Sequence, residues 1–375
     1  MVATLKAEVH HRLDAFSLDA AFEAGDGVTG VIGPSGAGKT TLLAAIAGLS
    51  RPRRGRITLG DETFLDTERG VFLPPERRRI GYVFQEARLF PHLSVEQNLD
   101  YGARRRGAAE AIPRDEIIAL LGLAPLLDRM PHRLSGGEAQ RIAIGRALLS
   151  APRLILMDEP LSNLDIRRRR EIMPYLEALH RRLELPILYV SHNIDEVVRL
   201  ADRVLVMQQG GIVASGGVAD VLNRAGVQSL ILGEEAREAD PATIVDACVA
   251  RHDEAHHLTE VEFAGATLTL SRIELPIGAP VRLRLHARDI AIATERPAAL
   301  SIQNVIEARI SELHPAGAAQ MDVRLAVGRE PHSVTLIARI TARAAERLAL
   351  TPGRDVWALV KTVALASDLG RFDPD

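Results

Sequence analysis

The residues best suited to do chemistry form a glycine-rich stretch near the N-terminus. They follow the pattern G-x-x-x-x-G-K-T and are Gly33, Pro34, Ser35, Gly36, Ala37, Gly38, Lys39 and Thr40. An apolar run leads into the stretch and a helix-like run leads out of it. This context predicts a phosphate-binding loop (P-loop), in which backbone N–H groups and a helix N-terminus hold phosphate oxygens. Lys39 then reaches the outer phosphates, and the Thr40 hydroxyl ligates Mg²⁺. Thr41, the next residue, is expected to contact the nucleotide as well.

Two acidic residues, Asp158 and Glu159, directly follow the apolar run Leu154–Met157. Four apolar residues in a row are typical of a buried strand, so Asp158 is expected at the carboxyl edge of that strand. There it holds Mg²⁺ through water, while Glu159 polarises an attacking water as general base. A strand-ending acidic turn explains the pair equally well when it is taken alone. The P-loop upstream favours the catalytic interpretation.

A capping pattern, Ser135 followed three positions later by Glu138, opens a helix. Gly136 and Gly137 lie between the two and expose backbone N–H groups at the positive end of that helix. An ordinary helix cap has the same Ser-x-x-Glu spacing. The glycine pair favours a second anion-binding position.

The elements that must position these residues alternate between strands and helices. Apolar runs at 80–84, 154–157, 187–190 and 204–207 predict buried strands, and helical patterns separate them. Such alternation indicates a parallel sheet covered on both faces. The predicted fold is an α/β P-loop NTPase with a parallel-sheet core, an antiparallel β subdomain near the N-terminus and a helical subdomain over about 95–133.

The C-terminal third has a different pattern, with period-two alternation and recurrent glycine turns, and predicts a small all-β region. Two segments resemble each other, 244–249 with 305–310, and so do 278–283 and 353–358, which indicates an internal repeat. The predicted domains are a nucleotide-binding domain over 1–232, a linker over 233–243, a first β subdomain over 244–296 and a second over 297–368.

Composition sets limits on the function. The 375 residues carry 46 Lys and Arg against 49 Asp and Glu, a net charge of −3, and 3% aromatic residues. A nucleic-acid partner is therefore not expected. The single cysteine, Cys248, forms no intrachain disulfide, which fits a reducing compartment. No apolar run reaches membrane-span length, so we expect a soluble chain that reaches a membrane only through a partner.

Six motifs stand in the order found in ATP-binding-cassette (ABC) ATPases, and over roughly 1–230 the chain resembles that family. They are the P-loop, Gln85 after its strand, Leu134–Glu138, Asp158–Glu159, Ser162–Asp165 and Ser191–His192. The resemblance implies ATP and Mg²⁺ as cofactors, and a head-to-tail homodimer in which each ATP touches one P-loop and the other copy's Ser135, Gly136 and Gly137.

The resemblance also implies roles for single residues. Gln85 would sense the γ-phosphate and contact Mg²⁺, His192 would contact the γ-phosphate, and Asp165 would lie at the dimer contact. It names no residue that stacks on adenine. Phe16 falls in an alternating strand and is expected in the core.

The layout is similar to that of importer subunits, with one nucleotide-binding domain and a C-terminal β extension. Within the importers, the segments 86–92, 300–305 and 360–363 resemble the molybdate importer ATPases with a C-terminal mop domain, which implies a small all-β, OB-like fold for the tail. The resemblance also implies ATP hydrolysis coupled to uptake of molybdate or tungstate. The implied partners are two integral membrane permease subunits and, indirectly, an external molybdate-binding protein. The implied location is peripheral, at the cytoplasmic face of the inner membrane.

A tetrahedral dianion needs hydroxyl and N–H donors and one cation. Ser301, Asn304, Lys361 and Thr362 supply these in the mop-like tail, while Gln303 stands where that family commonly has Arg. The alternative is a tail that only stabilises the dimer.

Two other functions stay open at this point. One is an importer ATPase for sulfate, iron, a polyamine or a sugar. The other is a non-transport ABC ATPase, although such proteins usually carry paired cassettes or long coiled coils, and the sequence has neither a second P-loop nor heptads.

Overall fold

The computed structural model divides the chain into two compact units, Met1–Gly217 and Val218–Asp375. We refer to them as unit 1 and unit 2. The structure describes residues 3–13, 16–103, 113–182, 185–224, 226–232, 241–329 and 333–361. Among these residues, no helix combines the length and the apolar composition that a membrane span requires.

Unit 1 is built on one 11-stranded sheet, whose core is parallel. The core strands are neighbours in the order β10 (Arg203–Gln208), β3 (Val28–Ile32), β9 (Ile187–Val190), β8 (Leu154–Asp158) and β7 (Ile80–Val83). Residues of β3, β8 and β9 are buried along their whole length, as expected for strands covered on both faces. The carboxyl ends of these strands therefore meet at one edge of the sheet.

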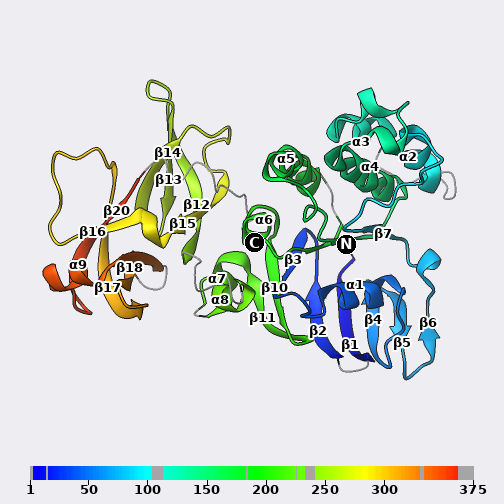
Figure 1. Ribbon diagram of the computed structural model, residues 1–375, viewed down its shortest axis with the longest axis horizontal. Helices are drawn as coiled ribbons and strands as arrows, with labels where there is room; N and C mark the ends of the chain where they lie inside the picture. Colours follow the sequence, from blue (N-terminus) through cyan, green and yellow to red (C-terminus); the bar gives the residue numbers. More distant parts are fainter. Residues whose placement is uncertain are drawn as a thin grey trace. The chain divides into compact units, whose positions relative to one another are not determined.

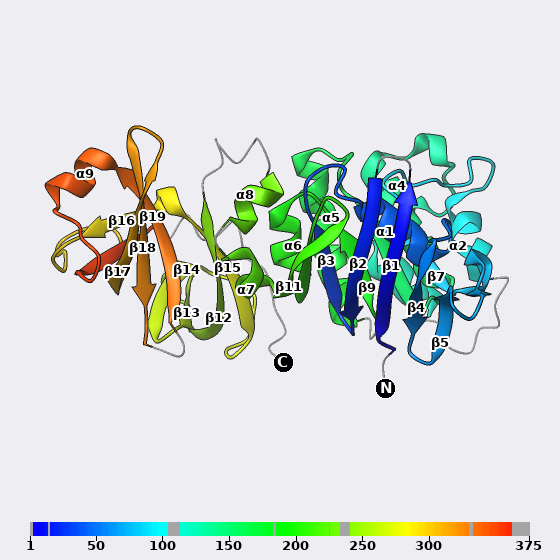
Figure 2. The same cartoon turned by 90° about the horizontal axis from the view of Figure 1, so that it is seen from below.

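An antiparallel arm continues the same sheet. It runs through β2 (Phe16–Ala24), β1 (Leu5–Leu13), β4 (Arg54–Leu59), β5 (Glu62–Asp66) and β6 (Val71–Phe72). Figure 2 shows β2, β1, β4 and β5 following one another. The strand β11 (Gly211–Gly217) joins the arm to the parallel core.

Some helices of unit 1 pack on the sheet, and three others form a separate group. The helix α1 (Lys39–Ala47) contacts β1 and β2 of the arm and β8 of the core. Figure 1 shows α2 (Val95–Ala103), α3 (Arg114–Leu120) and α4 (Gly136–Leu149) gathered together, away from the arm. The remaining helices are α5 (Ile166–Arg182) and α6 (Ile194–Leu200). The predicted α/β P-loop fold with an antiparallel subdomain and a helical subdomain is confirmed.

A fully buried arginine fastens the C-terminal end of α1. Arg78 has no exposed surface, and its Nη1 donates to the carbonyls of Ala45 and Ile46 at 2.9 and 2.6 Å. Its Nε donates to the carbonyl of Leu73 at 2.7 Å. Burial lowers the pKa of Arg78 to about 10, but the side chain stays charged at neutral pH. The last carbonyls of a helix carry partial negative charge, so this cation adds to the cap that Gly48 makes in a left-handed conformation, with its N–H donating to the Ala45 carbonyl at 3.1 Å.

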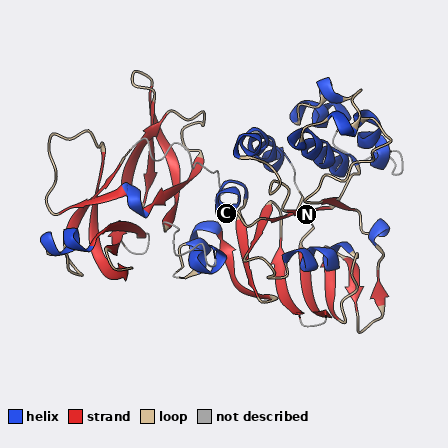
Figure 3. Cartoon of the chain, viewed as in Figure 1, coloured by secondary structure: helices blue, strands red, loops and turns tan. Residues whose placement is uncertain are grey.

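Unit 2 consists mainly of strands (Figure 3). Its first sheet has the order β14 (Ala266–Ser271), β13 (Leu258–Phe263), β12 (Ala242–Asp253) and β15 (Pro280–His286). Its second has the order β16 (Ile290–Ala293), β20 (Asp355–Val360), β17 (Asn304–Ala316), β18 (Gln320–Val327) and β19 (Val334–Thr341). Buried residues of both sheets form one hydrophobic cluster.

The predicted internal repeat is confirmed by topology and by a shared irregularity. The order β14-β13-β12-β15 is matched by β19-β18-β17-β20. Each first strand bulges at the same place, between Val249 and Arg251 in β12 and between Ile310 and Glu312 in β17. Each bulge carbonyl accepts a 2.7 Å hydrogen bond from a turn glycine. A shared bulge is a specific feature, because it re-aims a strand at a defined residue.

Two short helices, α7 (Val218–Leu222) and α8 (Val227–Leu232), pack within unit 2. Asn223 exchanges hydrogen bonds with the backbone of Ile244 at 2.7 and 2.8 Å, and Gln228 does so with Ala242 at 2.6 and 3.2 Å. The predicted domain bounds stay a prediction, and most of the predicted linker lies outside the described residues. The helix α9 (Ala342–Arg347) lies between β19 and β20.

Candidate nucleotide site

The P-loop connects β3 to α1 at the carboxyl edge of the parallel strands. Gly33 passes close to β10, since a Cβ on it would lie 2.2 Å from the Met207 carbonyl. Gly38 precedes α1 with a φ of 100°, and a Cβ there would lie 2.6 Å from the ring of Phe16. Both positions therefore require glycine, the first for space and the second for space and backbone conformation.

Lys39 lies under the loop. Its side chain is buried, and Nζ donates to the carbonyls of Gly33 and Pro34 at 2.8 and 3.0 Å. Burial lowers the pKa of Lys39, and the nearby Glu159 and Asp158 oppose this effect. The ammonium group is thus held against the loop, and its predicted contact with phosphate stays a prediction.

Thr40 and Asp158 come together as predicted. The Thr40 hydroxyl donates to Asp158 Oδ1 at 3.1 Å, across 118 positions of sequence. Asp158 is buried, and burial raises the pKa of its carboxyl group, while hydrogen bonds from Thr40 and Tyr82 act in the opposite direction. A hydroxyl and a carboxylate side by side are hard oxygen donors, which is the chemistry that Mg²⁺ selects.

This donor set fits a cation whose remaining ligands are phosphate oxygens. In the described part of the chain, no three His, Cys, Asp or Glu side chains gather in a metal-binding arrangement. A cation held by one hydroxyl, one carboxylate and the oxygens of a nucleotide does not need such a cluster, since Mg²⁺ usually takes one or two carboxylates plus substrate phosphates.

Glu159 and His192 form a contact beside this pair. His192 Nδ1 lies 3.1 Å from Glu159 Oε2, and half of the imidazole is exposed. Glu159 has a φ of 47°, so the chain turns sharply as it leaves β8. Its backbone N–H donates to the Val190 carbonyl at 3.0 Å, which fixes the turn at the end of β9. Two ionisable side chains are therefore presented at the same edge as the P-loop.

Gln85 lies on the loop that follows β7 and is exposed. The end of β7 is held in place, since buried Gln140 of α4 donates to the Phe84 carbonyl at 3.2 Å. In the part of the chain that the structure describes, the side-chain hydrogen bonds of Thr40 and Asp158 do not include Gln85. Its predicted contacts with Mg²⁺ and the γ-phosphate stay predictions.

Ser135 caps α4 with the predicted capping box. Its Oγ accepts from the Glu138 N–H at 3.3 Å, and Glu138 Oε2 accepts from the Ser135 N–H at 2.7 Å. These hydrogen bonds lower the pKa of Glu138, the bond to the Ser135 backbone being the largest cause. Gly136 and Gly137 make the first turn of the helix and pack beside Leu164 and Ile172. The first turn of a helix presents N–H groups that no carbonyl of the helix itself accepts.

Asp165 precedes α5 and is exposed. Its Oδ1 accepts from the Arg168 N–H at 2.9 Å, and its Oδ2 lies 3.6 Å from Arg168 Nε. This hydrogen bond stabilises the start of α5. The predicted role of Asp165 at a dimer contact stays a prediction.

Two side-chain contacts near the nucleotide site were not predicted from sequence. The Tyr82 hydroxyl donates to Asp158 Oδ2 at 3.1 Å. Phe16 packs partly buried against the core, as predicted, and its ring also lies against Gly38 at the end of the P-loop. A tyrosine in an otherwise apolar strand was the available signal for the first, because its hydroxyl needs a partner when it is buried.

The predicted oxyanion residues differ in burial and in hydrogen bonding. Asn304 is buried, and its amide group exchanges hydrogen bonds with the Thr269 backbone of β14 at 2.6 and 2.9 Å. Ser301 and Lys361 are exposed, and Thr362 lies outside the described residues. The oxyanion site stays a prediction.

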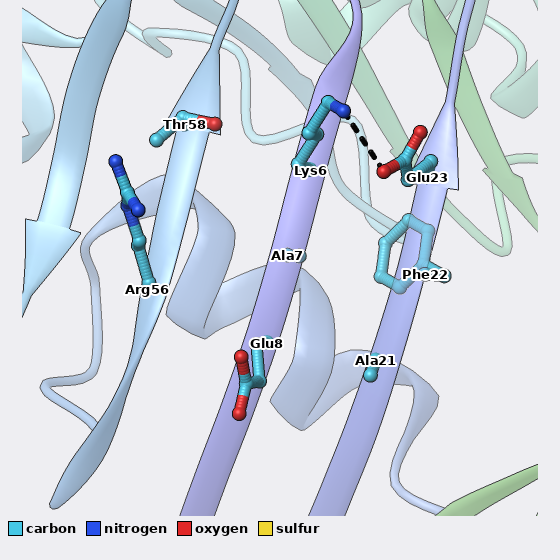
Figure 4. A pocket seen from close by; sticks show the side chains of 8 residues that line it. All are labelled: Lys6, Ala7, Glu8, Ala21, Phe22, Glu23, Arg56 and Thr58. Atoms are coloured by element: carbon cyan, nitrogen blue, oxygen red, sulfur yellow. Dashed lines mark ion pairs between the residues drawn. The ribbon is translucent and has the colours of Figure 1, made fainter.

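A separate groove of about 480 Å³ lies on the antiparallel arm (Figure 4). Lys6 and Glu8 line it from β1, where they alternate with buried residues, so the groove is on the face away from the core. Lys6 Nζ pairs with Glu23 Oε1 at 2.9 Å. Its lining includes none of the predicted nucleotide residues, so it is not part of this site.

Comparisons with known proteins agree with this geometry. Residues 18–162 match the family model described as ABC transporter, and residues 300–366 match the TOBE domain. The molybdenum import ATP-binding protein ModC of Rhizobium etli is 47% identical over 365 residues, which cover 96% of this chain and 99% of that protein. The chain belongs to the ModC family of ABC transporter ATP-binding proteins.

Other members are equally similar along their length. ModC of Paramagnetospirillum magneticum is 46% identical over 363 residues, covering 96% of this chain and 98% of that protein. ModC 1 of Azotobacter vinelandii is 47% identical over 344 residues, covering 91% and 92%. The chain is therefore an ABC ATPase that binds and hydrolyses ATP, with an OB-like TOBE domain at its C-terminal end, as the sequence predicted.

Proposed function

We propose that the chain is the ATPase subunit of an importer that takes up molybdate, or the similar oxyanion tungstate. One observation carries the chemical part of this proposal. The P-loop lysine, the pair Thr40–Asp158 and the pair Glu159–His192 converge at one edge of the parallel sheet. The names and full-length similarity of the relatives support the transported solute.

Binding begins with the P-loop. Its backbone N–H groups and the N-terminus of α1 hold the phosphates of ATP, and Lys39 exchanges its two loop carbonyls for phosphate oxygens. Thr40 and Asp158 would hold Mg²⁺, which supplies positive charge that stabilises the phosphates during transfer. Phe16 is suited to contact the base, because its ring already lies against the end of the loop.

Hydrolysis then depends on Glu159. Its carboxylate is placed to orient and polarise a water, and His192, 3.1 Å away, fixes the carboxylate and reaches the same space from β9. Gln85 extends from the loop after β7, where it is placed to respond to the γ-phosphate. A general base contributes about 10²- to 10⁴-fold to the rate, so loss of the Glu159 carboxylate should lower turnover by at least about 100-fold.

The site is completed by a second copy of the chain. The anion-binding start of α4 at Ser135–Gly137 satisfies its own cap within the chain and leaves the N–H groups of its first turn for a ligand. A head-to-tail homodimer brings this turn of one copy to the P-loop of the other, with Asp165 near the contact. ATP binding closes such a dimer, and hydrolysis reopens it.

Closure of the dimer has to act on membrane subunits. We place the dimer peripherally, at the cytoplasmic face of the inner membrane, against two integral permease subunits that receive the solute from an external binding protein. The support is membership in the ABC transporter family together with the importer names of the relatives. The TOBE-containing tail is proposed to sense the oxyanion, using Ser301, Lys361, Thr362 and the region of Asn304.

Uptake of labelled molybdate tests this proposal. A strain lacking only this gene should lose uptake, and the gene supplied in trans should restore it. Excess unlabelled tungstate should compete and excess sulfate should not. Retention of molybdate uptake in the deletion strain, with loss of another solute's uptake, would overturn the assignment.

A further inference from the structure

The two oxygens of the Asp158 carboxylate accept hydrogen bonds from two different residues, Thr40 and Tyr82. The Thr40 hydroxyl donates to Oδ1 and the Tyr82 hydroxyl donates to Oδ2, both at 3.1 Å. A carboxylate whose two oxygens accept from two different directions has a fixed rotation. Only one of these donors, Thr40, belongs to the P-loop.

The register of the sheet explains how Tyr82 reaches this carboxylate. The strands β7 and β8 are parallel, and Tyr82 is paired with Leu156. Asp158 lies two residues beyond Leu156, and alternate residues of a strand point to the same face. The Tyr82 side chain therefore lies on the face of Asp158, and its length spans the remaining rise along the strand.

The Tyr82 ring is held in this orientation from its other side. It stacks on Phe84, with 4.2 Å between ring centroids and 25° between the planes. The guanidinium of Arg88 lies over the Phe84 ring at 4.3 Å, and the Phe84 carbonyl is anchored by Gln140. Burial and the adjacent carboxylate raise the pKa of Tyr82, so its hydroxyl stays a donor at any physiological pH.

We propose that Tyr82 is a positioning residue for the cation of the nucleotide site, holding Asp158 Oδ2 so that Oδ1 faces Thr40. This rests on the proposed Mg²⁺ role of Thr40 and Asp158. A donor that fixes a ligand carboxylate improves cation affinity without touching the cation, and the loss of such a partner typically weakens metal affinity by about 10- to 100-fold.

The test is the gain in nucleotide affinity that Mg²⁺ provides. Binding of a fluorescent ATP analogue to the full chain is measured in EDTA and across a Mg²⁺ titration, for the wild type and Tyr82→Phe. The variant keeps the ring and its stack but lacks the donor. We expect unchanged affinity in EDTA and a Mg²⁺ half-saturation about 10-fold higher.

Tyr189→Phe is the matched control. The Tyr189 hydroxyl donates to Glu196 Oε2 at 2.8 Å, so Tyr189, which is buried on β9, is likewise a tyrosine bonded to a carboxylate. If Tyr82→Phe acts by positioning Asp158, Tyr189→Phe should leave the Mg²⁺ half-saturation unchanged. An equal rise in both variants would mean a general loss of stability and would overturn the role of Tyr82.

Asp158→Asn separates this proposal from the one it rests on. Loss of the Mg²⁺ gain in Asp158→Asn, with a normal gain in Tyr82→Phe, would overturn the role of Tyr82 alone. A normal gain in Asp158→Asn would overturn the cation site itself. Should Tyr82→Phe fail to fold, Tyr82→His keeps a ring with a donor. Its half-saturation should lie between those of the wild type and Asp158→Asn, and a value equal to that of Asp158→Asn would contradict the proposal.

Discussion

The two units place polar side chains at strand ends for opposite purposes. In unit 1, Asp158 ends β8, and within the described residues its carboxylate accepts hydrogen bonds from two side-chain hydroxyls, those of Thr40 and Tyr82. In unit 2, Asn304 begins β17 and bonds to the backbone of Thr269. A carboxylate oriented only by side-chain hydroxyls keeps lone pairs for a ligand, whereas an amide that completes the hydrogen bonding of a strand backbone is committed to the fold. A polar residue at a strand end therefore indicates a site when its partners are side chains rather than backbone groups.

The internal repeat sharpens this contrast. Thr243 stands one residue before the repeat segment in β12, as Asn304 does in β17. The Thr243 hydroxyl accepts from the Ile337 N–H of β19 at 3.2 Å, while Asn304 binds β14. Each repeat thus fastens its first strand to the third strand of the other repeat. Equivalent positions with equivalent contacts indicate a structural role for both.

The largest effect should come from unit 1, which contains the proposed general base. Glu159→Gln removes the proposed base and should lower ATP turnover by at least about 100-fold, while ATP still binds and holds the dimer closed. Steady-state hydrolysis and size-exclusion chromatography with ATP measure the two. Lys361→Ala, in the tail, is the control and should leave turnover within about twofold of the wild type. Near-normal hydrolysis by Glu159→Gln would remove the role given to Glu159.

The second prediction compares two arginines that fasten helix ends. Arg78 is fully buried under α1, whereas partly exposed Arg354 donates to the carbonyls of Leu348 and Ala349 after α9 at 2.6 and 2.9 Å. Arg78→Met removes a charged donor from several carbonyls around the end of α1 and should cost about 3 kcal/mol in unit 1. Arg354→Met should cost about 1 kcal/mol in unit 2, because water replaces the lost donor.

The sequence allows the two unfolding transitions to be followed separately. The single tryptophan, Trp357, lies in β20 of unit 2, so its fluorescence reports that unit during denaturation. Far-UV circular dichroism is dominated by the longer helices of unit 1. Equal losses for the two variants would show that burial does not decide the strength of these caps.

The third prediction tests the structural role of Asn304. Asn304→Ala leaves the N–H and the carbonyl of Thr269 without this partner, and should cost about 2 kcal/mol in the Trp357 transition. Thr243→Val, at the equivalent position, should cost about 1 kcal/mol, because its hydrogen bonds are longer. Unchanged stability of Asn304→Ala together with lost molybdate binding would instead make Asn304 an oxyanion ligand.

The smallest effect concerns pH. Hydrogen bonds lower the pKa of Glu138 in the folded chain. The carboxylate therefore stabilises α4 fully at pH values above the pKa of Glu138 in the unfolded chain. This stabilisation is lost as the pH falls through the pKa of Glu138 in the folded chain. Glu138→Gln keeps an acceptor that does not titrate. Between pH 7 and pH 4 its Tm should fall by about 1 to 2 °C less than that of the wild type, measured by circular dichroism.

Asp355 is the control for this measurement in unit 2. Its pKa is also lowered, by Arg309, but the pair lies in solvent, where an ion pair contributes little. Asp355→Asn should leave the pH dependence of the Trp357 transition unchanged. A larger effect for Asp355→Asn than for Glu138→Gln would contradict the importance given to the cap of α4.

Much of the nucleotide site could be predicted from sequence because its residues lie where secondary structure ends. Glycines 33 and 38, the strand that ends at Asp158 and the Ser135 cap are local patterns whose geometry follows from neighbouring residues. Tyr82 could not be predicted, because its partner is 76 positions away and depends on the register of β7 against β8. The role of Asn304 depends likewise on how two repeats pack, which short tail motifs do not specify.

The central claim is that each ATP site is shared between two copies, and a mixing experiment tests it most directly. Lys39→Ala disables the P-loop, and Ser135→Asp keeps a good helix cap while placing a negative charge where phosphate should bind. In a head-to-tail heterodimer of the two variants, one site has an intact P-loop and an intact α4 terminus. The account predicts that each variant alone is inactive and that an equal mixture regains up to about a quarter of wild-type ATP hydrolysis. A mixture that stays inactive, although differently tagged copies co-purify in ATP, would contradict it.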